Sequence, residues 1–189
     1  MTSGRIESVR IIEKIDSLYQ HQPHVPEIDL PSHNFGQSFY PKKKSFGPAL
    51  ENRFKHPVHH FQIQVSNIQK SAMFYGELLG RLGFAKVFET EGMVEWQKEG
   101  TRIIVAQCPK RLISDGYHRK RVGLNHIAFR ASSRAAVDDL YRNYLLPKKI
   151  LTLYGGPKEW EGYDPGYYAV YFEDPDRIKL ELVYVPGDL

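Results

Sequence analysis

The chain has 189 residues and a formal net charge of +4, a length that suits one domain with a substantial core plus an appendage. Its basic runs, 42–44 and 119–121, are short, so they do not indicate a nucleic-acid-binding face. No apolar run approaches the length of a membrane span, and the start lacks the apolar core of a signal peptide, so we expect a soluble, cytoplasmic protein. Cys108 is the single cysteine, which excludes an internal disulfide.

The first 56 residues predict an N-terminal appendage. Apolar residues recur from Ile6 to Leu18 with charged residues between them, which predicts an amphipathic helix that needs a surface to lie on. Residues 21–57 hold six prolines and no usable periodicity, which is typical of an irregular arm. We therefore divide the chain into an arm at 1–56 and a folded domain at 57–186.

The folded domain begins with a strand, a helix and three strands. Residues His60 to Val65 alternate between polar and apolar side chains, as a half-buried strand does. Ser66 or Asn67 can cap the helix that follows, and Gly83 ends its apolar stripe. Three short strands are then predicted at 85–89, 93–97 and 102–108.

The same pattern restarts after a polar, basic connector at 110–121. Residues 126–131 alternate as a strand, and the serines at 132–133 can cap a second helix. One weak strand and two strong ones complete the unit, at 150–154, 167–172 and 178–185. The chain therefore contains an internal repeat of one βαβββ unit, at 58–109 and 123–186.

The loop at 155–166 is predicted to act as a lid. Its glycines and prolines make hinges and a stiff frame, while Trp160 and Tyr163 offer apolar cover. An ordinary surface loop has the same composition and is the alternative.

Superposing the two units brings polar side chains to one face of the strands. Because residues i, i+2 and i+4 share a face of a strand, the opposite, apolar face suits packing under the two helices. The polar face collects His60, Gln62, Gln64, Arg102, Ile104, Ala106, His126, Ala128, Arg130, Lys179, Glu181 and Val183. We therefore predict an α+β fold in which paired βαβββ modules form a cupped, barrel-like mixed sheet with the helices on the outside.

Three side chains on this polar face indicate a metal site. His60 and His126 occupy equivalent positions in the two units, and Glu181 lies in mid-strand among apolar neighbours. Two imidazoles and one carboxylate match the 2-His-1-carboxylate pattern of a divalent metal with open positions, and neither type needs costly deprotonation near pH 7. We interpret the three as metal ligands. The alternative is that each one only forms hydrogen bonds on a polar strand face.

Cations on the same face predict the charge of a ligand. Arg102, Arg130 and Lys179 share the strand parity of the metal ligands, and converging cations beside a dication need an anion to offset their repulsion. We therefore expect a substrate with a carboxylate or phosphate, with Arg130 as its direct partner and with Gln62 and Gln64 orienting it. Each cation can instead lean out to solvent at the sheet rim.

Several motifs between residues 57 and 186 are together specific for one fold. They are His60 followed by 65–68, Asn125 to Phe129, Tyr171 to Asp176, and Lys179 to Glu181. In these motifs the chain resembles the vicinal oxygen chelate superfamily, which includes glyoxalase I, extradiol dioxygenases, and bleomycin and fosfomycin resistance proteins. The resemblance implies paired modules cupped around a metal, with His60, His126 and Glu181 at ligand positions.

Departures from the patterns of this superfamily bear on the reaction. Glyoxalase I usually has a second carboxylate, which is a ligand and takes part in proton transfer, where this chain has Ile104. Tyr171, ten residues before Glu181, fits the signature of extradiol dioxygenases, but their acid/base histidine corresponds to Gly162. A turn residue that is usually glycine is Arg177, which predicts a positive φ for a non-glycine residue. Neither the glyoxalase I reaction nor the extradiol dioxygenase reaction is therefore expected of this chain in unchanged form.

We therefore expect a divalent-metal-dependent enzyme, with Fe, Mn, Ni or Zn as the metal, that chelates neighbouring oxygens of a small, anionic substrate through lyase-, isomerase- or dioxygenase-type chemistry. Tyr171 is the candidate catalytic residue. The runner-up is a non-catalytic protein of the bleomycin-resistance type that sequesters a small molecule, and a third possibility is an interaction module that uses the arm. Because members of the superfamily commonly pair, we also expect a homodimer, with neither nucleic acid nor a membrane as partner.

Overall fold

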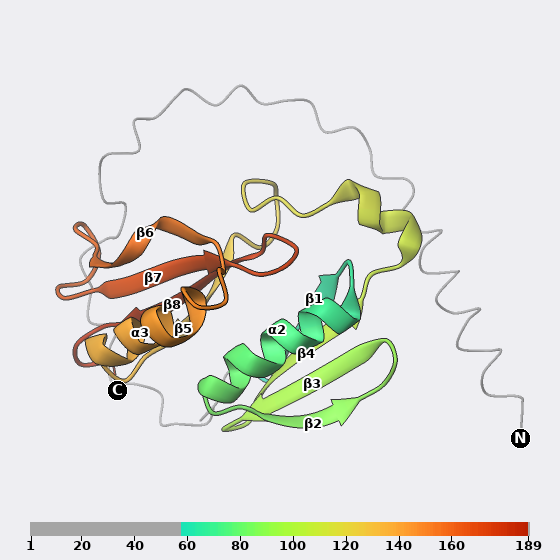
Figure 1. Ribbon diagram of the computed structural model, residues 1–189, viewed down its shortest axis with the longest axis horizontal. Coiled ribbons are helices and arrows are strands. Elements are labelled where there is room, and N and C mark those ends of the chain that lie inside the picture. Colours follow the sequence, from blue (N-terminus) through green and yellow to red (C-terminus); the bar gives the residue numbers. More distant parts are fainter. Residues whose placement is uncertain (1–57, 189) are drawn as a thin grey trace, which may run out of the picture. The chain divides into compact units, whose positions relative to one another are not determined.

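Two four-stranded sheets form the part of the protein that the computed structural model describes, residues 58–188 (Figure 1). The first module contains β1 (His60–Val65), α2 (Ile68–Arg81), β2 (Ala85–Glu89), β3 (Met93–Lys98) and β4 (Thr101–Gln107). The 3₁₀ helix η1 (Lys110–Asp115) follows it. The second module contains β5 (His126–Arg130), α3 (Arg134–Leu140), the π-helical turn η2 (Tyr141–Leu145), β6 (Thr152–Glu159), β7 (Tyr168–Glu173) and β8 (Lys179–Tyr184).

Both modules have the same strand order, β1-β4-β3-β2 and β5-β8-β7-β6. In each, the opening strand pairs in parallel with the last strand, and the other pairings are antiparallel. A crossover must join the parallel partners, and a helix on one face of the sheet forms part of each crossover (Figure 1). The predicted α+β fold of paired βαβββ modules is thus confirmed. The two mixed sheets remain separate and do not close into a barrel.

Helix α2 begins and ends where the sequence predicts. Asn67 is extended, and its side chain accepts a hydrogen bond of 2.9 Å from the backbone N–H of Lys70, as a helix-capping residue does. Gly83 follows the last turn with a φ of 84°, a conformation that costs glycine little. The side that faces the sheet is buried at Ile68, Ser71, Tyr75, Leu78 and Leu79.

The second helix is shorter and changes form. Ser133 caps α3 by accepting a hydrogen bond of 3.1 Å from the backbone N–H of Ala136. After Leu140 the backbone widens into the π turn η2. A π turn holds one more residue than an α turn, and here the consecutive side chains of Tyr144 and Leu145 are both buried.

The prediction of a loop at 155–166 is wrong over its first part. Strand β6 continues through 155–157 and ends at Glu159. Its register with β7 shifts between Leu153 and Lys158, which marks a bulge. Because β6 is the edge strand of its sheet, one side forms no ladder hydrogen bonds, and a bulge, glycines and a proline are tolerated there.

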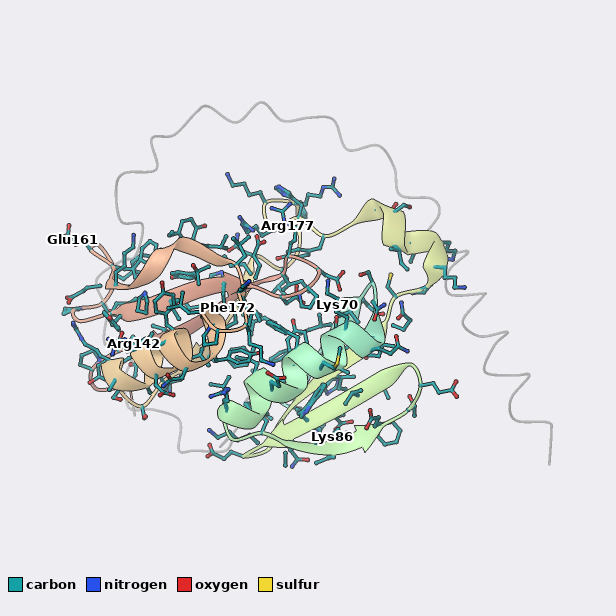
Figure 2. All side chains as sticks on the ribbon, in the orientation of Figure 1. Lys70, Lys86, Arg142, Glu161, Phe172 and Arg177 are labelled. Carbon is teal, nitrogen blue, oxygen red and sulfur yellow. The ribbon has the colours of Figure 1, made fainter. Side chains whose placement is uncertain are left out.

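One hydrophobic core joins the two modules. Phe172 on β7 is fully buried in it, whereas Lys86, Arg142 and Glu161 lie on the outside (Figure 2). The strands contribute the residues of their apolar faces to this core, namely Ile63, Val65, Ile103, Val105, Val170, Phe172, Leu180 and Leu182. Helix residues of both modules complete it.

The modules meet through their helix-covered sides. The hydroxyl of Tyr144, after α3, donates to the backbone carbonyl of Phe74 on α2 at 3.2 Å. Lys148 reaches Glu77 of the same helix at 2.8 Å. Because the polar strand faces lie on the other side of each sheet, they point away from this contact.

The turn between β7 and β8 fastens the second module to α2. Asp174 accepts a hydrogen bond of 2.8 Å from the hydroxyl of Tyr75 on α2. Two backbone N–H groups of its own turn also donate to it, at 2.9 and 2.7 Å. Arg177 in this turn has a φ of 68°, which confirms the positive φ expected there.

Asp174 makes the stability of this contact depend on pH. Burial raises the pKa of Asp174 from 3.8 to about 6 and outweighs the hydrogen bonds that act the other way. The folded state therefore binds the proton more tightly than the unfolded state does. The contribution of this group to stability is present below about pH 4 and is lost as the pH rises through about 6, a loss of about 3 kcal/mol.

We predict that Asp174→Asn flattens this decline. An amide can still bond the Tyr75 hydroxyl but does not titrate, so the free energy of unfolding should fall less between pH 4 and pH 7 than in the wild type. Urea unfolding at each pH measures the difference. The control Asp164→Asn changes an exposed carboxyl and should keep the wild-type slope. Equal slopes for Asp174→Asn and the wild type would contradict the prediction.

Three expectations fall on residues 1–57, outside the described residues. They are the amphipathic helix from Ile6 to Leu18, the proline-rich arm and the domain boundary after residue 56, and all three stay predictions. Within residues 58–188, no helix is long and apolar enough to cross a membrane.

Candidate functional site

The imidazole of His126 and the carboxylate of Glu181 meet on the polar face of the second sheet. Strands β5 and β8 are parallel neighbours, with His126 opposite Lys179 and Ala128 opposite Glu181. A row here is the set of side chains that lie directly opposite one another on neighbouring strands. The register places His126 and Glu181 on one face, in successive rows of that face, and His126 Nε2 lies 3.0 Å from Glu181 Oε2. Glu181 is fully buried, whereas the side chain of His126 is 33 % exposed.

Asn125 fixes which nitrogen of His126 carries a proton. Its Nδ2 donates to the carbonyl of Arg119 at 2.9 Å, which directs its Oδ1 to His126 Nδ1 at 2.7 Å. An amide oxygen can only accept, so Nδ1 holds a proton, and in the neutral ring Nε2 presents a lone pair. Glu181 Oε2, which this nitrogen faces, has no other hydrogen-bond partner. Two lone pairs at this distance repel, so a proton or a metal ion belongs between them.

Two tyrosine hydroxyls hold the other side of the Glu181 carboxylate. Tyr167 donates to Oε1 at 2.5 Å, and Tyr171, opposite Glu181 on β7, also bonds the carboxylate. Burial alone would raise the pKa of Glu181, but the imidazole and the two hydroxyls outweigh burial and lower it. Burial, together with the nearby carboxylate, raises the pKa of both tyrosines. The carboxylate is therefore anionic at neutral pH, and the tyrosines remain protonated donors.

Aromatic rings from β6, β7 and the segment between them form a wall beside this carboxylate. The ring of Trp160 packs edge-on against Tyr154 and Tyr171, with centroids 5.6 and 5.0 Å away. The Tyr171 ring lies 6.1 Å from that of His126. Lys179 Nζ lies 4.4 Å from the Tyr171 centroid, and burial lowers the pKa of Lys179. Trp160, the predicted lid residue, is part of this wall, and its movement on ligand binding stays a prediction.

His60, the third predicted metal ligand, does not join the pair within one chain. It is exposed on β1 of the other sheet, where its Nδ1 lies 2.8 Å from Nδ1 of His59. Within residues 58–188, no group of three or more His, Cys, Asp or Glu side chains gathers as metal ligands. The reason is the packing of the modules, which turns the polar face of β1 away from that of β5.

The predicted substrate-binding glutamines lie with His60 on the first module. Gln62 and Gln64 are exposed on β1. They line a cavity of about 320 Å³ together with His118 and Arg121 of the connector. They are therefore separate from the pair in the second module.

The three predicted cations do not converge in one chain. Arg102 belongs to the first module and pairs with Glu95 at 2.8 Å. Arg130, with 61 % of its side chain exposed, lies 3.9 Å from the carboxylate of Asp188. Of the three, Lys179 alone stands in the same row as His126, which favours it over Arg130 as the partner of an anion.

A cavity of about 540 Å³ lies elsewhere, between α2, the segment from η2 to β6 and the β7–β8 turn. Its acidic side chains are already engaged, since Glu77 pairs with Lys148 and Asp174 bonds Tyr75. None of the candidate ligands lines it. We therefore interpret it as space between the packed modules.

The sequence does not single out Tyr167 or Glu95, and it assigns no role to Asn125. Asn125 precedes a candidate ligand directly, so a search for amides beside histidines would find it. Glu95 shares the parity of the polar face within its strand, so the alternation there was a usable signal. Tyr167 lies between Gly166, whose φ is 77°, and the start of β7 at Tyr168, so strand alternation cannot predict its contact with Glu181.

Comparison with known proteins identifies the family. Residues 58–182 match the family model of the Glyoxalase/Bleomycin resistance protein/Dioxygenase superfamily. The chain belongs to this superfamily. Protein YqjT of Bacillus subtilis strain 168, which is uncharacterized, is a superfamily relative that is 38 % identical over 126 residues, covering 67 % of this chain and 97 % of YqjT.

Solved structures of the superfamily agree with the fold. The crystal structure of a candidate glyoxalase from Bacillus halodurans is 35 % identical, with a TM-score of 0.65, over 71 % of this chain and 99 % of that one. A glyoxalase/bleomycin resistance protein/dioxygenase domain from Frankia sp. EAN1pec is 20 % identical, with a TM-score of 0.53, over 67 % of this chain and 95 % of that one. The Frankia domain supports the fold alone.

We predict that Tyr167→Phe destabilises the fold. The change removes a donor from a buried, charged carboxylate, and such a hydrogen bond contributes about 1.5–3 kcal/mol. Urea unfolding at pH 7 should show a loss of about this size. Tyr154→Phe removes a hydroxyl from a ring that is 54 % exposed and should cost less than about 0.5 kcal/mol. A loss no larger for Tyr167→Phe than for this control would contradict the prediction.

Proposed function

We propose that the protein is a divalent-metal-dependent enzyme of the glyoxalase superfamily that acts on a small, oxygen-bearing, anionic substrate. The observation that carries the proposal is the pair of His126 Nε2 and Glu181 Oε2, 3.0 Å apart, with Oε2 lacking any other hydrogen-bond partner. Imidazole nitrogen and carboxylate oxygen are donors that Fe, Mn, Ni and Zn accept. Asn125 and Tyr167 hold the other atoms of the two side chains, as outer partners of metal ligands do.

His60 is the third ligand in this proposal, and a second copy of the chain supplies it. The polar face of each module points away from the contact between modules, and Gln62, Gln64 and Ala128 on these faces are exposed. A homodimer with twofold symmetry can lay the first module of one copy on the second module of the other, at two equivalent sites. The homodimer thus completes two metal centres with residues that one chain keeps apart.

The residues around the pair suit a reaction at a metal-bound oxygen compound. A divalent ion held by His126 and Glu181 would supply Lewis-acid chemistry toward oxygen atoms of the substrate. Lys179 stands beside the pair as the partner of an anionic group. Trp160 packs against Tyr171, which lies opposite Glu181, and the burial of Glu181 strengthens electrostatic interactions there. Tyr171, the candidate catalytic residue, acts as a hydrogen-bond donor, because its raised pKa excludes it as a base at neutral pH.

Sequestration of a small molecule without turnover is the second candidate function. Glu181 is the one carboxylate beside His126 within residues 58–188, and tyrosine hydroxyls already hold it, which leaves no free base in this half of the site. Turnover that a chelator abolishes would support the enzyme. Stoichiometric binding without chemistry would support sequestration.

The metal is the first test of the proposal. Protein reloaded with iron, manganese, nickel or zinc should hold about one divalent ion per chain by elemental analysis, and His126→Ala should hold almost none, since too few donors remain. His118→Ala removes an exposed imidazole of the connector and should leave the metal content unchanged. A wild-type protein that takes up none of the four metals would end the proposal.

The charge of the substrate is the second test, with oxalate as a probe that has neighbouring oxygens and a negative charge. Lys179→Gln should weaken oxalate binding to the manganese-loaded protein about tenfold, the loss of one charge-assisted contact of roughly 1.5–3 kcal/mol. Arg130→Gln, at an exposed position, should change the Kd less than about twofold. Calorimetric titration measures both. If Arg130→Gln has the larger effect, the role belongs to Arg130, and if neither variant has one, the site does not select anions.

A further inference from the structure

Glu95 occupies a polar-face position that the second module makes recognisable. In the first sheet Glu95 on β3 lies opposite Ile104 on β4. In the second sheet Tyr171 on β7 lies opposite Glu181 on β8. The repeat therefore equates Ile104 with Glu181, and Glu95 with Tyr171. The first module has no carboxylate at this position of β4 and carries one on the adjacent strand β3.

The other polar-face groups of the two modules correspond as well. His60 lies opposite Arg102, just as His126 lies opposite Lys179. Each module thus presents one imidazole and one cation in the same row, with a carboxylate in the next row. Both polar faces therefore carry an imidazole, a cation and a carboxylate, and Glu95 supplies the carboxylate of the first face.

Glu95 is a largely buried carboxylate that is held by one ion pair. It is 9 % exposed, and its Oε1 accepts from Nη1 of Arg102 at 2.8 Å. Its Oε2, unlike Oε2 of Glu181, is not among the buried side-chain atoms of residues 58–188 that lack a hydrogen-bond partner. By contrast Glu173, at 5 % exposure, has both its oxygens engaged, by Arg119 and Arg177.

Four polar-face side chains share one arrangement: a neighbouring side chain contacts one of their two polar atoms and does not contact the second. The pairs are His60 Nδ1 with His59, His126 Nδ1 with Asn125, Glu181 Oε1 with Tyr167, and Glu95 Oε1 with Arg102. A neighbour that fixes one atom of an imidazole or carboxylate orients the other toward a metal. The remaining atoms are two Nε2 and two Oε2.

We propose that Glu95 is a fourth ligand of the metal, presented with His60 by one copy of the chain to His126 and Glu181 of the second copy. The inference rests on the proposed metal-dependent function and adds a residue to the same site. Two neutral imidazoles and two carboxylates would balance the charge of a dication with donors that Mn and Ni accept. Arg102 then serves Glu95 as Tyr167 serves Glu181.

Calorimetric titration of Mn²⁺ and Ni²⁺ into the metal-free full chain tests the inference. Glu95→Gln should raise the Kd for the metal about tenfold or more, while Glu159→Gln, which changes an exposed, ion-paired carboxylate, should leave the Kd unchanged. A Kd for Glu95→Gln within twofold of the wild type overturns the inference, and the proposed function survives that result if His126→Ala still loses the metal. A wild type that binds neither ion overturns both.

A rescue variant separates a ligand from a residue that only supports the fold. Ile104→Glu puts a carboxylate at the position that the repeat equates with Glu181. Added to Glu95→Gln, it should bring the Kd back to within about threefold of the wild type, and Ile104→Gln should not. If Glu95→Gln alone misfolds because Arg102 loses its partner, the same pair of changes is made in Glu95→Gln/Arg102→Gln. Equal recovery with Ile104→Gln, or none with Ile104→Glu, overturns the inference.

Discussion

A buried carboxylate that faces an imidazole lone pair is the constraint on which the second module depends. Glu181 has no exposed surface, and an uncompensated charge in such a place costs several kcal/mol. Tyr167 and Tyr171 compensate one side of the carboxylate, while Asn125 holds the ring of His126 so that Nε2 points at the other side. The arrangement is complete only with a cation between Nε2 and Oε2. A proton can fill that place, and in the proposed function a divalent ion takes it.

The way the two modules pack decides what one chain can bind. Their apolar strand faces and helices share one core, and the bond between Asp174 and Tyr75 fastens the second module to α2. Both polar faces are consequently turned outward, with His60 on one and His126 on the other. A symmetric pair of chains can bring these faces together at two places. In the proposed function, the metal centre therefore depends on the oligomeric state of the protein.

Alternation along the strands predicts much of this site, because a strand has only two faces. It identified the polar face of β1, β5 and β8, and the repeat aligned His126 with His60 and gave the βαβββ modules of the fold. The alternation along β3 also predicts that Glu95 lies on the polar face. It cannot tell which faces of two modules meet, since that depends on contacts distant in sequence, such as Asp174 with Tyr75. It also missed the second half of β6, where a bulge at an edge strand hides the period of two.

The most direct test of a metal centre shared by two copies is a complementation measurement. His60→Ala and His126→Ala each spoil both sites of a homodimer. In a mixed dimer one site loses both histidines and the other keeps both. After subunits are exchanged at equal concentrations, random pairing makes about half of the dimers mixed, so bound metal should return to about a quarter of the wild-type level. Mixed dimers verified by mass that bind no metal would contradict the shared centre, and so would unmixed His60→Ala protein that binds metal as the wild type does.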